Sequence, residues 1–279
     1  MSESVYITAE IGINHNGELE LAKKLIDVAV VAGVSAVKFQ KRNPEVCVPE
    51  CQKSVMRQTP WGDMTYLEYR HRIEFQKNEY DEIERYCEER GIQWYTSIWD
   101  EDSLEFILRY DPVHLKIPSA VLTHSPLLEA VADTQIHTFI GTGMSTIEEI
   151  DRAVQIFKSK SCPFTLMHSN SSYPAKNEEL NLTCIPEYKK RYNCPVGYSG
   201  HEFGLLPTVL AVVLGASSVE RHITMNRSMV GSDHLASVEP IGLMKLVSYI
   251  RTAQTVMGDG VKKVYESELS AMKKLRYFE

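Results

Sequence analysis

The sequence predicts an α/β protein folded as a single (β/α)8 TIM barrel. Short apolar runs alternate with amphipathic helical stretches, which indicates a parallel sheet joined by right-handed crossovers. The alternation repeats eight times, and eight such units in about 260 residues match a closed barrel in number and size. A doubly wound open sheet is the alternative, but no GxGxxG motif follows the first apolar run.

The first unit shows the pattern most clearly. The run VYITAEI precedes a stretch with apolar residues at three- and four-residue spacing, and Gly33 ends that stretch as helix-terminating glycines do. The eight expected strands are Val5–Ile11, Ser35–Gln40, Ile92–Ser97, Val113–Ser119, Ile136–Thr142, Pro163–Ser169, Cys194–Gly200 and Ser217–Ile223. The helices expected after them span about 18–33, 77–90, 101–110, 125–133, 146–159, 179–190, 205–214 and 240–257.

One segment, residues 41–76, interrupts this rhythm. The residues in it that break the pattern are Pro44, Pro49, Pro60 and Gly62. Excursions of this length inside compact domains are usually functional or partly helical. We therefore expect one barrel domain over residues 1–279 with a long excursion after the second strand.

Composition excludes several classes of protein. The net charge is −7 and the pI about 5.8, which argues against a nucleic-acid surface. No basic segment followed by an apolar one begins the chain, and no run of about 18 apolar residues occurs, so neither a signal peptide nor a membrane span is expected. The six cysteines are scattered without CxxC spacing, which favours a reduced, cytoplasmic protein.

Polar residues concentrate at the carboxyl ends of the expected strands, where active sites of such barrels lie. These residues are Glu10, Asn14, His15, Lys38, Gln40, Ser97, Lys116, Ser119, Thr142, His168, Ser199, His201, Glu220 and His222.

Two of these residues, His201 and His222, end the seventh and eighth strands. Neighbouring strands lie about 4.8 Å apart, so two inward-pointing imidazoles could bind one cation. Imidazole nitrogens suit manganese, iron, cobalt or zinc, and Glu10, Glu220 and Asp233 are candidate carboxylates to complete the shell. The alternative is that one histidine packs in the core as a hydrogen-bond donor.

Lys38 and Lys116 form a second group, because each follows apolar residues within a strand. A buried ammonium needs a partner. Together with hydroxyls from Ser119, Thr142 and Ser199, the two lysines would suit a ligand with a phosphate and a carboxylate. One alternative is that each lysine pairs with an internal glutamate. Another is a Schiff-base lysine, which needs no metal and is therefore disfavoured by the histidine pair.

Six motifs in order along nearly the whole chain resemble the sialic acid synthase family. They are AEIGINHNG (Ala9–Gly17), AVKFQK (Ala36–Lys41), LKIPS (Leu115–Ser119), TGMST (Thr142–Thr146), YSGH (Tyr198–His201) and ERHIT (Glu220–Thr224). The resemblance implies a (β/α)8 barrel that condenses phosphoenolpyruvate with an aldose such as N-acetylmannosamine, releasing phosphate. It also implies a divalent metal, usually Mn2+, with Mg2+ or Co2+ as other candidates, and a homodimer.

The resemblance also implies roles for individual residues. His201 and His222 would bind the metal, and Lys38, Lys116, Ser119 and Ser199 would contact phosphoenolpyruvate. Glu10 would lie near the metal and the sugar, while Tyr173 and Asp233 would lie on the acceptor side. For the proton transfers we expect Glu10 first and Asp233 second. Gln40, Ser97 and Thr142 complete the expected substrate-binding set.

Three departures from the family pattern stand out. Where the family reads KIGSGE, this chain reads KIPSAV, so that Val121 replaces a glutamate that is a candidate for activating water. Gly141 replaces the serine of STGM. The antifreeze-like domain of other members, which supplies an arginine to the acceptor, lies beyond the end of this sequence. The long excursion over residues 41–76, which contains Arg57, Trp61, Arg70 and Arg72, could cover the barrel mouth instead.

Other functions remain as alternatives. A phosphorylated acceptor, as in the octulosonate and heptulosonate phosphate synthases, would need a second anion site, and no Lys-Pro-Arg motif provides one. A metal-dependent aldolase acting on pyruvate would release no phosphate. A catalytically silent sugar-binding barrel would explain Val121, but not the retention of several buried charged groups.

Overall fold

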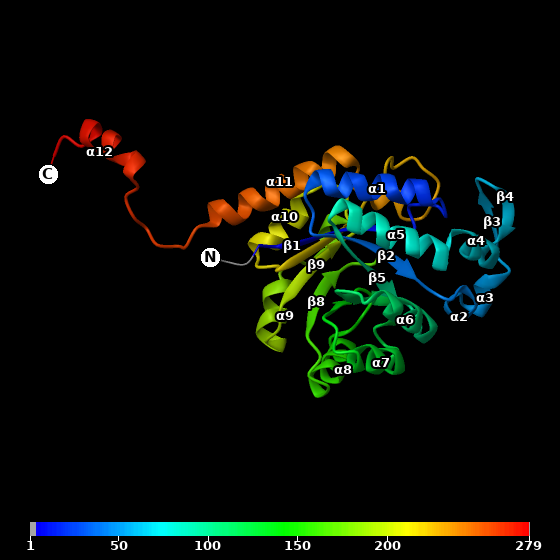
Figure 1. Ribbon diagram of the computed structural model, residues 1–279. Coiled ribbons are helices and arrows are strands. Elements are labelled where there is room, and N and C mark those ends of the chain that lie inside the picture. Colours follow the sequence, from blue (N-terminus) through cyan, green and yellow to red (C-terminus); the bar gives the residue numbers. More distant parts are fainter. Residues whose placement is uncertain (1–3, 279) are drawn as a thin grey trace.

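The computed structural model describes residues 4–278, and in it eight parallel strands close into a barrel (Figure 1). The strands follow the order β1-β10-β9-β8-β7-β6-β5-β2, and β1 pairs with both β10 and β2. Their bounds are β1 Tyr6–Gly12, β2 Ala36–Lys41, β5 Gln93–Ile98, β6 Leu115–Ile117, β7 Thr138–Gly141, β8 Phe164–Ser169, β9 Val196–Gly200 and β10 Ser218–His222. The predicted (β/α)8 barrel is therefore confirmed.

A helix follows each barrel strand and packs its apolar face on the outside of the sheet. The bounds are α1 Leu19–Ala32, α5 Lys77–Arg90, α6 Glu101–Ile107, α7 Ser125–Asp133, α8 Ile147–Ser159, α9 Cys184–Tyr192, α10 Leu206–Val213 and α11 Pro240–Met257. Local signals explain several ends: Gly33 adopts the left-handed conformation after α1, and Thr146 forms a capping box with Glu149 before α8. Helix α9 begins at Cys184 and not near residue 179 as expected, because Asn177–Glu179 form a separate 3-10 turn.

The barrel interior is divided into an apolar floor and a polar mouth. Tyr95, Phe139 and Met167 form a cluster at the floor, and Tyr6 packs against it. Because side chains alternate across a strand, the residues two or four positions further along these strands face the same interior nearer the carboxyl ends. Aromatic and sulfur-containing side chains thus close one end of the barrel and leave the other end for polar groups.

The excursion after β2 forms a small subdomain beyond the carboxyl end of that strand (Figure 1). It contains α2 Pro44–Cys47, α3 Glu50–Lys53, the antiparallel hairpin β3 Met56–Thr59 and β4 Gly62–Thr65, and α4 Tyr66–Ile73. Glu74 anchors its base, since its carboxylate accepts hydrogen bonds from Lys41 Nζ at 3.2 Å and from the Arg42 amide at 2.9 Å. These contacts hold α4 beside the mouth of the barrel.

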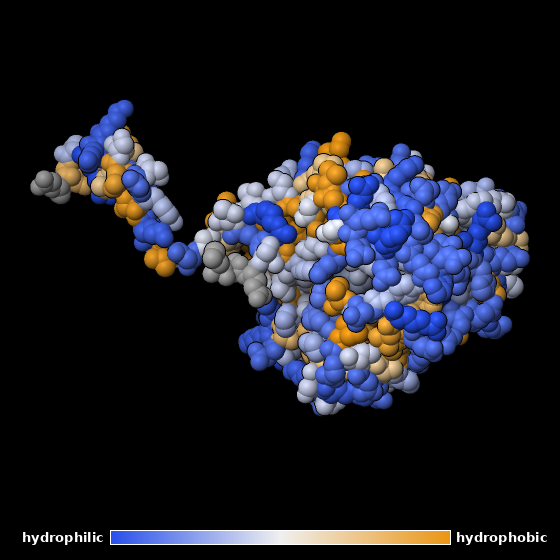
Figure 2. Space-filling view, in the orientation of Figure 1, coloured by the Kyte–Doolittle hydropathy of each residue, from blue (hydrophilic) through white to orange (hydrophobic). Residues whose placement is uncertain are grey.

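After α11 the chain leaves the barrel as an extended arm that ends in η5 Glu266–Glu268 and α12 Leu269–Leu275 (Figure 1). Apolar side chains are exposed on this arm and on α11, among them Val264, Leu275, Ile241 and Tyr249 (Figure 2). Over residues 4–278, none of the helices combines the length and apolar character of a membrane span.

Candidate active site

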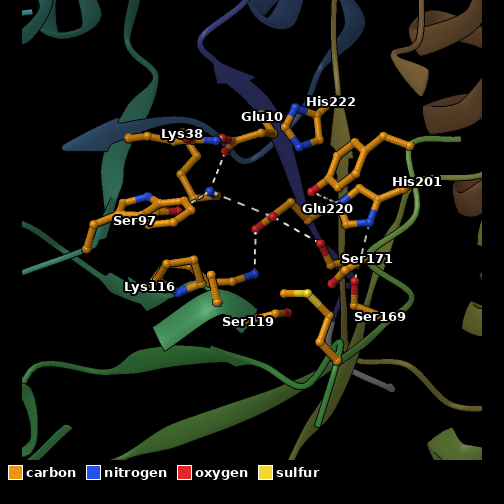
Figure 3. Close-up of a pocket in the computed structure, with 17 residues that line it drawn as sticks. Glu10, Lys38, Ser97, Lys116, Ser119, Ser169, Ser171, His201, Glu220 and His222 are labelled. Carbon is orange, nitrogen blue, oxygen red and sulfur yellow. Dashed lines mark hydrogen bonds and ion pairs between the residues drawn. The ribbon is translucent and has the colours of Figure 1, made fainter. Parts of the chain in front are cut away.

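A cavity of about 170 Å³ opens at the carboxyl ends of the strands (Figure 3). It gathers side chains from seven barrel strands and from the loops that follow them. The expected site residues that line it are Glu10, Lys38, Gln40, Ser97, Lys116, Ser119, Tyr173, Ser199, His201 and His222. The strand register explains this convergence, because Glu10 of β1 lies beside both Lys38 of β2 and His222 of β10.

Two lysines and two glutamates form a continuous chain of charges across the floor of this cavity (Figure 3). Lys38 Nζ forms an ion pair with Glu10 and lies 3.7 Å from Glu220 Oε1. Lys116 Nζ donates to Glu220 Oε2 at 3.0 Å. All four side chains are at least nine-tenths buried. Charges of opposite sign therefore alternate along the chain, which is how buried ions are tolerated in a protein interior.

The two carboxylates of this chain titrate differently. Burial raises the pKa of Glu10 to about 7, and the single nearby lysine only partly opposes this effect. Burial also raises the pKa of Glu220, but the combined attraction of Lys116 and Lys38 outweighs it and lowers the pKa to about 2. Glu220 is thus a fixed counter-ion, whereas Glu10 can take up or release a proton near neutral pH.

Hydroxyl groups complete the lysine side of the cavity. Lys38 Nζ donates to Ser97 Oγ at 2.6 Å, and Ser199 Oγ donates to Glu220 Oε1 at 3.1 Å. Ser119 Oγ accepts from the Gly143 amide at 2.9 Å. The alternative that each lysine pairs with an internal glutamate is therefore what the structure contains. The same lysines also line the cavity, so this pairing does not remove them from the site.

Small residues are needed where Ser119 approaches β7. A Cβ atom added at Gly141 would lie 2.8 Å from Ser119 Oγ and 2.9 Å from its amide nitrogen. Such a separation is too short for any side chain. Gly141, one of the departures from the family pattern, thus gives Ser119 the space to reach the cavity.

The two histidines lie on the other side of Glu220 from the lysines in this view (Figure 3), with ring centroids 5.5 Å apart. The Asn170 carbonyl can only accept a hydrogen bond, so His201 Nδ1, 2.5 Å away, carries the proton. His201 Nε2 then keeps its lone pair and accepts from the Tyr173 hydroxyl at 2.9 Å. Burial and the neighbouring His222 lower the pKa of His201 to about 4, and burial lowers the pKa of His222 as well. Both rings are therefore neutral at pH 7.

This geometry suits a pair of metal ligands. A carbonyl bonded to one ring nitrogen leaves the other nitrogen to bind a metal, which is the usual arrangement around ligating histidines. His222 Nδ1 is buried without a hydrogen-bond partner among residues 4–278, and it lies 3.7 Å from Asp233 Oδ2. No preformed group of three His, Cys, Asp or Glu ligands occurs among residues 4–278. The pair could thus hold an ion only with additional ligands, such as substrate oxygens, as in open catalytic sites.

Gly12 allows the carboxylate and the imidazole to approach each other at the end of β1. The residue has φ +56°, and an added Cβ would lie 2.9 Å from Glu10 Oε1 and 3.3 Å from His222 Cε1. The pairing of β1 with β2 shifts register between Glu10 and Gly12. Just before this irregularity Glu10 is in register with Lys38 on one side and His222 on the other, and its Oε1 accepts a hydrogen bond from Gln40 Nε2 at 3.1 Å.

Two expected site residues lie outside the cavity. Thr142 faces away because Phe139, three residues earlier on β7, faces the barrel interior, and the Thr142 hydroxyl donates to the Met167 carbonyl at 3.1 Å. Asp233 does not line the cavity but lies beside His222. Of the other strand-end residues, His168 bonds the Leu180 carbonyl and His15 stacks on Phe75, so both have structural contacts.

Several lining residues were not selected from the sequence. They are Trp99, Pro118, Ala120, Met144, Ser169 and Ser171. Side-chain alternation would have favoured Ser169 over His168, because one strand face leads from Met167 to Ser169. Glu220 was expected at the strand ends as a candidate metal ligand; it lines the cavity, and its ion pairs with Lys38 and Lys116 give it a different role. Ser171 lies in a loop that has no periodicity.

Val121 marks the position of the missing family glutamate. It belongs to the 3-10 turn Ser119–Val121 and lines a separate cavity with Arg42, Trp99 and His124, while Ala120 borders both cavities. A side chain at position 121 therefore points beside the main cavity and not into it in this structure.

Comparisons with known proteins find relatives that align with most of this chain. A model of the NeuB family matches residues 25–262. The N-acetylneuraminate-9-phosphate synthase of Homo sapiens is 36% identical over 273 residues, which cover 97% of this chain and 76% of that protein. The N,N'-diacetyllegionaminic acid synthase of Legionella pneumophila is 35% identical over 275 residues, covering 96% and 77%. The crystal structure of N-acetylneuraminic acid synthetase from Leptospira borgpetersenii, in complex with citrate, aligns with a TM-score of 0.87 and 33% identity over 98% of this chain and 91% of that one.

Proposed function

Since this chain belongs to the NeuB family, we propose that it condenses phosphoenolpyruvate with a six-carbon aldose of the N-acetylmannosamine type. The products are a nonulosonic acid and free phosphate, and the enzyme is a carbon–carbon bond-forming transferase. The observation that carries the proposal is that one cavity has two buried lysines on one side and two neutral imidazoles on the other. Phosphoenolpyruvate is a polyanion and requires cationic partners. An aldehyde acceptor requires a group that polarises its carbonyl oxygen, such as a metal ion held by the imidazoles.

Lys38 and Lys116 bind the phosphate and carboxylate of phosphoenolpyruvate, and the hydroxyls of Ser119 and Ser199 orient them. In the free protein each ammonium is paired with a glutamate. The approaching polyanion shares these ammonium groups with the glutamates, so the lysines need no large movement. A preorganised cation pair of this kind stabilises the negative charge that shifts toward the phosphate as it leaves.

His201 and His222 would hold a divalent ion, for which we propose Mn2+, with Mg2+ and Co2+ as other candidates. When bound, the ion supplies Lewis-acid polarisation of the acceptor carbonyl. The enol carbon C3 of phosphoenolpyruvate forms the new bond to the aldehyde carbon. Water then adds to C2, and the C2–O bond to phosphate breaks. Tyr173, on the His201 side, and Asp233, beside His222, would contact the acceptor hydroxyls.

Glu10 is the proposed proton-transfer group. It lies between Lys38 and His222, and its raised pKa of about 7 is matched to taking a proton from water and returning it near neutral pH. Glu10 would thus take over the role of the family glutamate that Val121 replaces in this chain. Asp233 is the second candidate, since it lies outside the cavity.

Phosphate release tests the proposal. Metal-stripped protein is supplied with Mn2+, phosphoenolpyruvate and a panel of N-acetylmannosamine, mannose, other hexosamines and their 6-phosphates. We expect release that requires both Mn2+ and one sugar and that disappears in His222→Ala. Release without any sugar, or release unaffected by His222→Ala, would overturn the assignment of the site.

The names of the relatives differ in one respect. The human protein is named for a 9-phosphate product, and the Legionella protein for an acid without phosphate. Membership of the family therefore leaves open whether the acceptor is phosphorylated.

We also propose that the protein works in the cytoplasm as a homodimer. Phosphoenolpyruvate is a cytoplasmic metabolite, and the apolar side chains exposed on α11 and on the arm would suit contact with a second copy. Cell fractionation tests the location, and sedimentation of the purified protein tests the dimer.

A further inference from the structure

A second cavity, of about 370 Å³, lies between the excursion and the loop that follows β10. The hairpin contributes Arg57, and α4 contributes Tyr66, Tyr69 and Arg70. The opposite wall is formed by Val230, Gly231 and Ser232. The phosphoenolpyruvate chemistry proposed above uses none of these side chains.

Arg70 is exceptional among the buried arginines. It is 5% exposed, its Nη2 has no hydrogen-bond partner, and no carboxylate within the described chain forms an ion pair with it. By contrast, buried Arg221 donates to Glu202 at 2.9 Å, and buried Arg42 lies 3.8 Å from Glu74. A buried guanidinium without an anion is costly. This cost would be removed if an anionic ligand entered the cavity.

A second arginine reinforces the first. Arg57 Cζ lies 4.7 Å from the centroid of the Tyr66 ring and Arg70 Cζ lies 5.9 Å from it, so that both guanidinium groups are near one aromatic ring. Among the described residues, those that line this cavity include no carboxylate to balance these two positive charges. The planar, multiple donors of guanidinium groups match the oxygens of a phosphate. The chemistry of the cavity is therefore that of a phosphomonoester site.

The second cavity adjoins the acceptor side of the candidate active site. Ser232 lines it, and the next residue, Asp233, has its carboxylate 3.7 Å from His222 Nδ1. A sugar whose aldehyde lies at the histidine pair and whose hydroxyls pass Asp233 would direct its far end toward Arg70 and Arg57. The consecutive residues Ser232 and Asp233 therefore link the wall of the second cavity to the histidine pair.

We propose that Arg57 and Arg70 bind a phosphate on the acceptor carbon farthest from the aldehyde, so that the acceptor is a hexosamine 6-phosphate. This inference rests on the proposed synthase function. It supplies the second anion site that no Lys-Pro-Arg motif provided, because the two arginines come from a hairpin and a helix thirteen positions apart and meet only in the folded excursion.

Steady-state kinetics with two acceptors test the inference. The kcat/KM values for N-acetylmannosamine and for its 6-phosphate are compared at saturating phosphoenolpyruvate and Mn2+. We expect wild type to prefer the 6-phosphate. Arg57→Gln and Arg70→Gln should raise the KM for the 6-phosphate, and each should lower the preference by about tenfold or more, as expected for losing one charge-assisted contact. Arg70→Lys, which retains the charge, should recover part of the preference.

Arg72→Gln is the matched control, because Arg72 lies on the same helix but stacks on Trp61, 4.4 Å from its ring centroid, outside the cavity. It should keep the wild-type preference. Arg57 is exposed, so its variant tests the idea even if Arg70→Gln does not fold. Equal kcat/KM values for the two acceptors in wild type, or equal losses for both acceptors in the variants, would overturn the inference while leaving the synthase function intact.

A failure of the synthase function would look different. Neither sugar would then support phosphate release, and calorimetric titration with N-acetylmannosamine 6-phosphate decides the matter directly. Binding that is weakened by Arg57→Gln but not by Arg72→Gln would support the phosphate site. Binding that is absent, or insensitive to both variants, would refute it.

Discussion

Replacing Glu220 by glutamine tests whether the buried charge chain stabilises the barrel. Lys116 and Lys38 lower the pKa of this carboxyl from its ordinary 4.5 to about 2. At about 1.36 kcal/mol per pKa unit, this corresponds to roughly 3 kcal/mol of stability at pH 7. Because the pKa is lowered on folding, the contribution is complete above pH 4.5 and is lost as the pH falls through 2. Removing one partner of a buried ion pair typically costs about 3–5 kcal/mol, which agrees.

The assay is urea unfolding at pH 7 in EDTA, so that no metal contributes. Glu220→Gln should lower the free energy of unfolding by about 3 kcal/mol at unchanged m-value. Glu187→Gln, an exposed glutamate on α9, is the control and should change it by less than about 0.5 kcal/mol. Combined with Lys116→Met, the Glu220 change should cost less than the sum of the two single changes. Additive costs, or a Glu220→Gln effect below about 1 kcal/mol, would refute the reasoning.

Three further outcomes follow from the site. Gly141→Ala should raise the KM for phosphoenolpyruvate, because the added Cβ would lie 2.8 Å from Ser119 Oγ; an unchanged KM would argue against that contact. His201→Ala should weaken Mn2+ binding, measured by electron paramagnetic resonance, and wild-type affinity in this variant would exclude His201 as a ligand. Burial raises the pKa of Glu10 from 4.5 to about 7, so the metal-free protein should lose stability relative to Glu10→Gln as the pH rises across this range; parallel pH profiles would contradict it.

The sequence was sufficient for the barrel because each strand and helix carries its own periodic signal. The ends of most elements were predicted to within a few residues. For example, the helix end predicted at Gly33 is confirmed. The start of α9 was missed, since the 3-10 turn at Asn177–Glu179 has no distinct pattern.

The site was recovered to the extent that strand ends identify it. Residues were chosen because they end a strand and not by the face of the strand on which they lie, which is why Thr142 was chosen and Ser169 was not. Interaction partners are even harder to predict. Nothing local in the sequence distinguishes Arg70, which has no ion pair within the described part of the chain, from Arg221, which is paired with Glu202. Such differences arise from tertiary packing between segments far apart in the chain.

Carbon–carbon bond formation is the central claim, and isotope labelling measures it directly. Phosphoenolpyruvate labelled with carbon-13 at C3 is incubated with the enzyme, Mn2+ and a hexosamine, or its 6-phosphate, labelled at C1. The account predicts a one-bond carbon–carbon coupling between the two labels in the product, appearing as phosphate is released. Label that appears in pyruvate, with no coupling to the sugar carbon, would contradict it.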